Sequence, residues 1–142
     1  MPLLKVIKVI EMNYILTNPP EHERSRELWM QHAAGFICFE SMRNYAVERI
    51  PADTDEQTRD KILAGIDDAI YGLMMMMDGV TGTLRNDEYI LRIDTSILLA
   101  KEGKIIQEIN TLEGDGMCMG FHGWKEGDFG EDDIVMVSDD EE

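Results

Sequence analysis

The amino-acid sequence predicts an α+β fold, in which an N-terminal helical hairpin or bundle of about three helices precedes a small antiparallel β-sheet. Two observations predict it. In the first half of the chain, apolar residues recur at steps of three and four, which is the spacing of one helix face. After Gly82 the apolar runs become short and are bounded by turn formers, as in strands. The 142 residues, 44% of them hydrophobic, suffice for one domain with a buried core.

Three segments carry the helical spacing. The first covers residues 3–14 and ends before Asn18-Pro19-Pro20, because proline lacks the amide hydrogen that a helix interior needs. The second runs from this proline pair to about Ile50. The third follows two overlapping capping patterns in residues 53–57 and ends at Asp78-Gly79, a typical glycine stop. The apolar stripe of the second helix consists of Leu28, His32, Gly35, Phe39, Met42 and Ala46.

The third segment also carries a stripe of small residues, Gly65, Ala69 and Gly72. A glycine inside a helix costs about 1 kcal/mol relative to alanine, so two of them need a compensating gain. We expect this gain to come from close packing of the stripe against the small residues 33–35 of the second helix.

The strands are expected in the second half of the chain. Residues 89–93, 96–99 and 104–109 are aliphatic or β-branched, and Glu102-Gly103 fits a tight hairpin turn between the last two. Met117, Met119 and Phe121 alternate with Cys118, Gly120 and His122, which predicts a further strand over 117–122.

The chain is expected to divide near residue 125. A single α+β domain would cover residues 1–125, and an acidic C-terminal segment would cover 126–142. Within that segment, the apolar run at 134–137 predicts an edge strand.

The charge balance excludes several classes of partner. The formal net charge is −16 at pH 7, whereas nucleic acids and anionic membranes need a basic face. The first sixteen residues include Lys5, Lys8 and Glu11, which fits neither a signal peptide nor a membrane span. Cys38 and Cys118 are too few for a disulfide framework, so we expect a cytoplasmic protein with reduced thiols.

The acidic residues gather at the end of the chain. Residues 126–142 contain nine acids and no base, which accounts for −9 of the net −16. One interpretation is a solvated tail that aids solubility. The other is an acidic surface that steers a basic protein partner onto the chain. The candidate partner-binding residues are Glu126, Asp128, Glu131, Asp132 and Asp133.

Complete catalytic motifs do not occur in the sequence. It has no phosphate-binding GxxxxGKS/T loop, no GxSxG elbow, no CxxC and no HExxH, so we expect no cofactor and no metal. Only the glycine-rich segment 113–130 gathers reactive side chains. The candidates for a small enzyme or metal site are Asp115, Cys118, His122 and Asp128. On one strand Cys118 and His122 would lie about 13 Å apart, too far for a catalytic hydrogen bond, so glycine-rich turns are the structural interpretation.

Four consecutive methionines, residues 74–77, end the third helical segment. Consecutive helical residues point about 100° apart, so the four cannot share one core face. One interpretation is a helix end that is covered on all sides. The other is an oligomer interface through Met75 and Met76, because methionine adapts to irregular apolar surfaces.

Two stretches, GIDDAIYGLMMMMDGVTG (65–82) and INTLEGDGMCMGFHGWKEGDFG (109–130), resemble a group of small, uncharacterised bacterial proteins. These proteins share a helix that ends in Asp-Gly and a later glycine-aromatic loop. In size, acidity and general pattern the chain also resembles immunity proteins of bacterial toxin systems, which bind and block a partner enzyme. The resemblance implies a protein partner and transfers no catalytic residue.

Three hypotheses follow for the function. The leading one is a non-enzymatic protein-binding module, an immunity-like inhibitor that presents an acidic surface to a basic partner. The second is a small enzyme or metal-binding protein that uses the segment 113–130. The third is a self-associating structural module, such as a homodimer, that is joined through the methionine-rich helix end.

Overall fold

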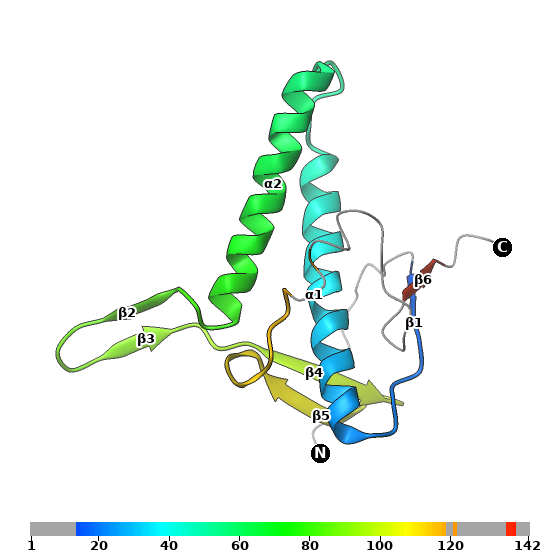
Figure 1. Ribbon diagram of the computed structural model, residues 1–142, viewed down its shortest axis with the longest axis vertical. Coiled ribbons are helices and arrows are strands. Elements are labelled where there is room, and N and C mark those ends of the chain that lie inside the picture. The colour runs from blue at the N-terminus through cyan, green and yellow to red at the C-terminus, as the bar shows by residue number, and fades with distance from the viewer. Residues whose placement is uncertain (1–13, 119–120, 122–135, 139–142) are drawn as a thin grey trace.

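A computed structural model of the chain describes residues 14–118, 121 and 136–138 (Figure 1). The fold class is α+β, as predicted, but the described residues contain two long helices rather than about three. In chain order the elements are β1 (Tyr14–Leu16), α1 (Glu23–Val47), α2 (Glu56–Met77), β2 (Thr83–Arg85), β3 (Ile90–Arg92), β4 (Ser96–Lys101), β5 (Lys104–Asn110), the 3-10 helix η1 (Thr111–Glu113) and β6 (Met136–Ser138).

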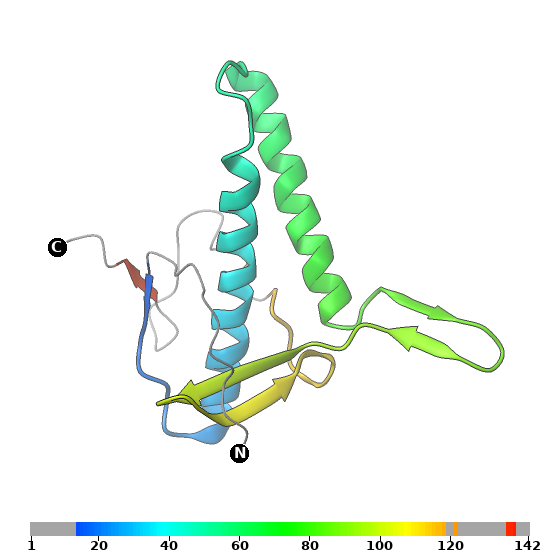
Figure 2. The same ribbon diagram turned by 180° about the vertical axis from the view of Figure 1, so that it is seen from behind.

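The two helices form an antiparallel pair, and the strands lie around one end of it (Figure 1 and Figure 2). The described strands pair as three separate two-stranded antiparallel ribbons, β1–β6, β2–β3 and β4–β5. Ribbon β4–β5 lies across the base of α1, whereas β2–β3 projects sideways from the end of α2. Among the described residues, no helix combines the length and the apolar character that a bilayer crossing requires.

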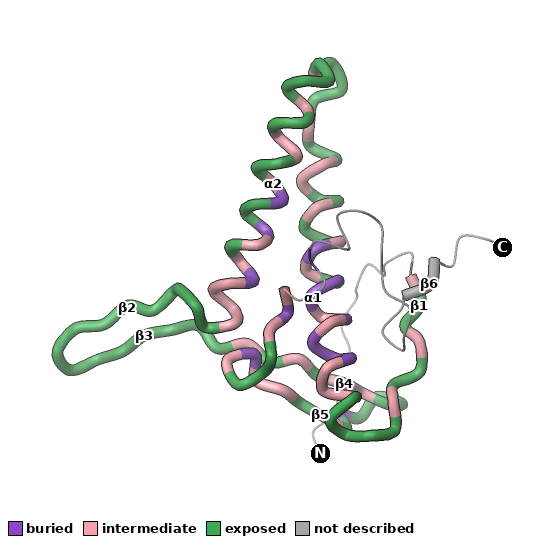
Figure 3. Tube along the Cα trace, viewed as in Figure 1, coloured by how far each residue is buried: buried purple, intermediate pink, exposed green. Residues whose placement is uncertain are grey.

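The core lies in the half of the helix pair nearer to β4–β5 (Figure 3). The rings of Phe39 and Tyr71 each meet Phe121 edge-on, with centroids 5.6 and 5.0 Å apart, which is a favoured aromatic arrangement. In the far half, Arg43 Nε donates to Asp67 Oδ1 at 2.7 Å. The buried core cluster consists of Ala33, Phe36, Phe39, Ile70, Met74 and Phe121.

The first predicted helix is not confirmed. Tyr14, at the end of its range, begins strand β1, which pairs antiparallel with β6. The Tyr14 ring also packs edge-on against Phe36 at 5.1 Å. Strand pairing and this core contact therefore decide the conformation here, against the local helical spacing. Residues 1–13 lie outside the described residues, and β6 overlaps the apolar run at 134–137.

The other two predicted helices are present with corrected starts. Helix α1 begins at Glu23, three residues after the proline pair. The N-cap of α2 is Asp55, whose carboxylate accepts a hydrogen bond from the Thr58 amide at 3.0 Å, so neither predicted capping pattern is used. The predicted stop of α2 is confirmed, because Gly79 takes a left-handed φ of 86° that favours glycine.

The expected packing of the small-residue stripe is wrong. Gly65, Ala69 and Gly72 are all exposed, and a Cβ added at either glycine would meet no atom within 4 Å. The helix pair is instead closed by Ile70 and Met74, which belong to the buried core. Helical spacing shows which residues share a face, but not which face another helix covers.

The three predicted strands at 89–93, 96–99 and 104–109 are confirmed as β3, β4 and β5. The predicted turn between β4 and β5 is also confirmed. Glu102 and Gly103 have φ values of 53° and 83°, as a two-residue hairpin turn of this twist requires. Strand β2, which pairs with β3, was not predicted.

The strand predicted over 117–122 is wrong at its described residues, 117, 118 and 121. Met117 and Cys118 lie in a turn, and the Phe121 amide donates to the Cys118 carbonyl oxygen at 3.0 Å. Gly116 precedes the turn with a φ of 114°, which breaks the extended backbone. The turn lets Met117 and Phe121 both be buried without an alternating strand.

Candidate functional site

The hairpin β2–β3 stands clear of the rest of the described chain (Figure 1 and Figure 2). At its tip, the Asn86 side-chain oxygen accepts hydrogen bonds from the Glu88 and Tyr89 amides at 2.9 and 2.8 Å. The Asn86 amide in turn donates to the Tyr89 carbonyl oxygen at 3.0 Å. Asparagine therefore closes this turn through its own side chain. The cross-strand partners are Thr83 and Arg92, Leu84 and Leu91, and Arg85 and Ile90.

One face of this hairpin is apolar. Cross-strand partners and alternate residues of a strand share a face, which places Leu84, Tyr89, Leu91 and Ile93 together. We call these four residues the apolar face. Their exposed fractions are 73%, 70%, 65% and 50%, respectively. The opposite face includes Ile90 and the two arginines of the strands.

The described part of the chain leaves the apolar face uncovered. Every residue of β2 and β3 is exposed (Figure 3). An isolated two-stranded hairpin is at best marginally stable in water, because neither face gains from burial. Clustered apolar side chains on a surface commonly mark a place of interaction. The hairpin therefore presents an uncovered apolar cluster on the described part of the chain.

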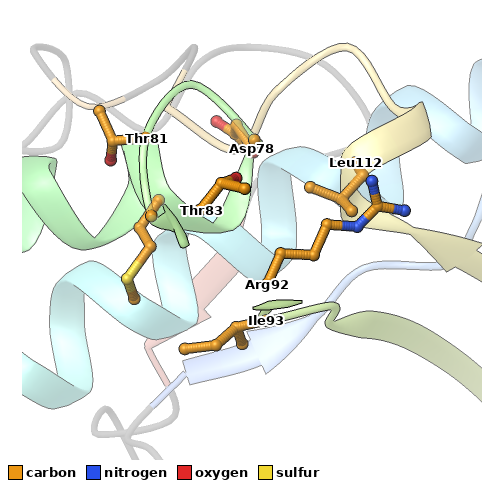
Figure 4. A pocket seen from close by; sticks show the side chains of 9 residues that line it. Asp78, Thr81, Thr83, Arg92, Ile93 and Leu112 are labelled. Carbon is orange, nitrogen blue, oxygen red and sulfur yellow. The ribbon is translucent and has the colours of Figure 1, made fainter. Parts of the chain in front are cut away.

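A cavity of about 220 Å³ lies at the root of the hairpin, between the end of α2, η1 and the two strands (Figure 4). Asp78 and Thr83 contribute oxygen atoms to its wall, and Arg92 extends across it toward Leu112. Ile93 belongs both to this lining and to the apolar face. We call this space the root cavity, and its size suits one side chain or a few water molecules.

Asp115, one of the predicted site residues, is fastened to α1 through Gln31. Gln31 is only 2% exposed, and its side-chain oxygen accepts hydrogen bonds from the Asp115 and Gly116 amides. Its side-chain nitrogen donates to the Glu27 carbonyl oxygen at 3.2 Å and to Asp115 Oδ2 at 3.1 Å. The Gln31 amide thus uses two donors and two acceptor positions.

Arg24 completes the attachment of Asp115. Its two terminal nitrogens donate to the two oxygens of the carboxylate at 2.9 and 2.7 Å, a bidentate pair. The hydrogen bonds from Arg24, with a smaller contribution from Gln31, hold the pKa of Asp115 below its usual range. The same pair raises the pKa of Arg24. Both carboxylate oxygens are therefore engaged, and Asp115 anchors the loop 114–116 to the helix.

Cys118, the second predicted site residue, is half-buried near Asp78 and Tyr71. Burial raises the pKa of Asp78, although hydrogen bonds from the Met117 amide and from Cys118 lower it. The charge of Cys118 raises the pKa of Tyr71, and burial raises the pKa of the other thiol, Cys38. A nearby positive charge is what usually activates a cysteine thiol. Asp78 and Tyr71, the neighbours of Cys118, do not supply one.

The remaining predicted site residues lie in the part of the chain that the structure does not describe. His122 lies outside the described residues, and so do the acidic candidates Glu126, Asp128, Glu131, Asp132 and Asp133. Within the described ranges, no group of three His, Cys, Asp or Glu side chains is arranged to hold a metal ion.

The methionine run spreads around the end of α2. Met74 is completely buried, whereas Met75, Met76 and Met77 are half-buried. Met76 lines the root cavity and packs so closely on Gly82 that an added Cβ there would come within 2.5 Å of its Cγ. The oligomer interface expected at Met75 and Met76 stays a prediction.

Sequence reasoning missed two features of this region. The alternation of Tyr89, Leu91 and Ile93 is visible in the sequence, but it predicts a strand without saying whether that strand is covered. The sequence does not indicate the role of Gln31, because the two backbone amides that it binds follow 84 and 85 residues later.

Comparisons of the chain with protein-family models, with curated protein sequences and with solved structures find no match. The resemblances drawn from the sequence therefore stay predictions. The function is argued below from the geometry of the described residues and from the charge of the chain.

Proposed function

We propose that the protein is a non-enzymatic protein-binding module and that the hairpin β2–β3 presents its docking surface. The observation that carries this proposal is the apolar face, on which Leu84, Tyr89, Leu91 and Ile93 are each at least half exposed. Contact with a protein would bury these side chains and remove the cost of keeping them in water. Tyrosine at such a position is also typical of residues that contribute strongly to binding.

The charge of the chain supports a second, electrostatic component of binding. Residues 14–118 contain 19 acids and 10 bases, a net −9, and the whole chain carries −16. A basic protein would be attracted over several ångströms, and salt would weaken that attraction. This component fits an immunity-like inhibitor that covers the basic site of a partner enzyme in the cytoplasm.

Affinity purification of the tagged full chain from its native cells tests this function. The chain is compared with L84T/L91T, which removes apolar surface but keeps strand propensity and net charge. The matched control is Ile90→Thr on the opposite face. We expect a stoichiometric bound protein that the wild type and the control retain and the double variant loses.

Two results would count against the proposal. One is a bound protein that all three chains retain equally, which would remove the hairpin from the interface. The other is that the wild-type chain recovers no stoichiometric partner, neither a different protein nor a second copy of the chain. For a basic partner, we also expect release as the salt concentration rises.

The alternative function is a small enzyme or metal-binding protein built on segment 113–130. The observation that favours it is the half-buried Cys118 thiol beside the Asp78 carboxyl and the Tyr71 phenol. Selective and rapid alkylation of Cys118 by iodoacetamide, or stoichiometric metal in the purified chain, would support this alternative. Slow alkylation at the rate of an ordinary thiol would reject a catalytic cysteine.

A further inference from the structure

We propose that the apolar face of hairpin β2–β3 packs against the same face of a second copy of the chain, across a two-fold axis. This inference rests on the proposed function, because it names the occupant of the same docking surface. A two-fold contact uses one patch on both copies, so that patch must complement itself in area, shape and charge. Each of these requirements can be compared with the described residues.

The available area fits a small symmetric dimer. A large side chain that is half to three-quarters exposed presents on the order of 100 Å² of apolar surface. The four residues of the apolar face therefore present roughly 400 Å² per copy and about 800 Å² for two copies. Specific interfaces bury about 1,200–2,000 Å² in total, of which somewhat more than half is apolar. The apolar face thus supplies the apolar centre that such an interface needs.

The shape of the hairpin is compatible with a two-fold arrangement. If the axis passes near the Leu84–Leu91 pair, the tip of each hairpin extends about 10 Å past the axis at ~3.3 Å per residue. That length brings the tip residues Asp87 and Glu88 level with the root of the other hairpin. The root cavity lies there, and Ile93 connects it to the apolar face.

The charges of the hairpin lie outside the apolar face. The tip carries two acids, Asp87 and Glu88, whereas Arg92 lines the root cavity. Arg92 Nε donates to Asp94 at 3.1 Å, and its side chain extends across the cavity (Figure 4). In an antiparallel, face-to-face pair, the acidic tips lie at opposite ends, and Arg85 and Arg92 stay on the opposite face, so the apolar centre of the contact contains no charge. A head-to-head pair would instead place like charges together.

The net charge gives this dimer a distinctive salt dependence. Two copies that each carry −16 repel one another at long range, and salt screens that repulsion. Burial of the apolar face does not weaken as salt is added. The dimer should therefore become tighter as the salt concentration rises, whereas a complex with a basic partner should become weaker.

Sedimentation equilibrium of the purified full chain tests the inference, over concentrations from about 1 to several hundred μM, a range that covers weak and moderate association. The variants are L84T/L91T on the apolar face and Ile90→Thr on the opposite face. We expect a monomer–dimer equilibrium for the wild type and for I90T, and an association at least tenfold weaker for L84T/L91T. Raising NaCl from about 0.05 to about 0.5 M should strengthen the wild-type dimer. Far-UV circular dichroism confirms that each variant keeps its fold.

Each other outcome overturns the second copy as the occupant. A wild-type chain that stays monomeric at every concentration does so directly. A dimer that L84T/L91T leaves unchanged places the interface elsewhere, for instance at Met75 and Met76. A dimer that salt weakens contradicts the electrostatic argument.

Failure of this inference and failure of the proposed function can be told apart. If the chain is monomeric but L84T/L91T loses a captured protein, the docking surface stands and its occupant is a different protein. If the chain is monomeric and capture is the same for all variants, both proposals fail.

Discussion

The molecule contains two ribbons of the same kind in different surroundings. Ribbon β4–β5 lies against α1, with Ile105 only 7% exposed and Arg26 of α1 donating a hydrogen bond to Gln107 of β5. Ribbon β2–β3 is also antiparallel, and its longer turn over residues 86–89 is closed by Asn86, yet every residue of its strands is exposed. Pairing and turn chemistry therefore form a ribbon without deciding whether one of its faces is covered.

The difference indicates what each ribbon contributes. The covered ribbon adds to the core of the single chain, so its apolar residues should be needed for folding. The exposed ribbon gains little from its apolar residues within one chain, so these should matter for association. Four predictions, taken from the largest expected effect to the smallest, test this division.

The first prediction compares matched truncations on the two ribbons. Ile105→Ala should lower the free energy of unfolding by about 2–4 kcal/mol, because it removes a buried side chain and leaves a cavity. Leu91→Ala should change the unfolding of the monomer by less than about 0.5 kcal/mol, because the side chain is already in water. Urea unfolding at a concentration that keeps the chain monomeric measures both values. Similar losses for the two variants would show that the hairpin is covered within the chain.

The second prediction concerns the loop that follows the covered ribbon. Gln31→Leu should lower the free energy of unfolding by about 2 kcal/mol, because the Asp115 and Gly116 amides lose their acceptor in a part-buried site. Gln57→Leu on the exposed first turn of α2 is the matched control and should have little effect. Urea unfolding serves for both. Equal changes in the free energy of unfolding for the two variants would mean that water replaces the Gln31 oxygen as acceptor without loss of stability.

The third prediction concerns the junction between α2 and the exposed ribbon. Gly82→Ala should lower the free energy of unfolding by about 1–2 kcal/mol, because Gly82 has a φ of 90° and faces Met76 closely. Gly72→Ala should raise it by about 0.5–1 kcal/mol, because its Cβ would enter open space on a helix. The two substitutions should therefore shift the melting temperature in opposite directions. A loss of stability in Gly72→Ala would contradict the open space beside α2.

The smallest expected effect is a pH dependence at Asp115. Hydrogen bonds from Arg24 lower its pKa, so the carboxylate stabilises the fold above the pKa of an unfolded aspartate, about 4. This contribution is lost as the pH falls through the lowered value. Asp115→Asn should therefore be less stable than the wild type at about pH 6, with the difference shrinking on acidification. Urea unfolding of both proteins across the pH range measures this difference in the free energy of unfolding. A difference that grows toward low pH would show that the Asp115 carboxylate does not stabilise the fold through Arg24.

How far the sequence predicts this molecule depends on the range of the interaction. Local chemistry predicted well: the Glu102-Gly103 turn and the Asp78-Gly79 stop each depend on adjacent residues. Tertiary contact decided the errors. Residues 14–16 became a strand because β6 pairs with them from more than a hundred residues away, and the stripe of Gly65 and Gly72 faced solvent.

The candidate site shows the same limit. Alternation predicted strand β3, which is confirmed, whereas the protein-binding module stays a prediction. Exposure of the apolar face follows from the direction in which the hairpin leaves α2. Asp115 and Cys118 were chosen for their chemistry. Their partners Arg24, Gln31 and Asp78 come from distant parts of the chain, so no local spacing could indicate them.

The position of Gln31 in the chain also has a consequence for synthesis. Helices α1 and α2 leave the ribosome well before residues 115 and 116, whose amides donate hydrogen bonds to the side-chain oxygen of Gln31. Phe121, whose ring packs against Phe39 of α1 and Tyr71 of α2, emerges later still. A nascent chain therefore holds a helical hairpin with an open apolar side until these later residues have emerged, and during that interval a chaperone would find its binding surface there.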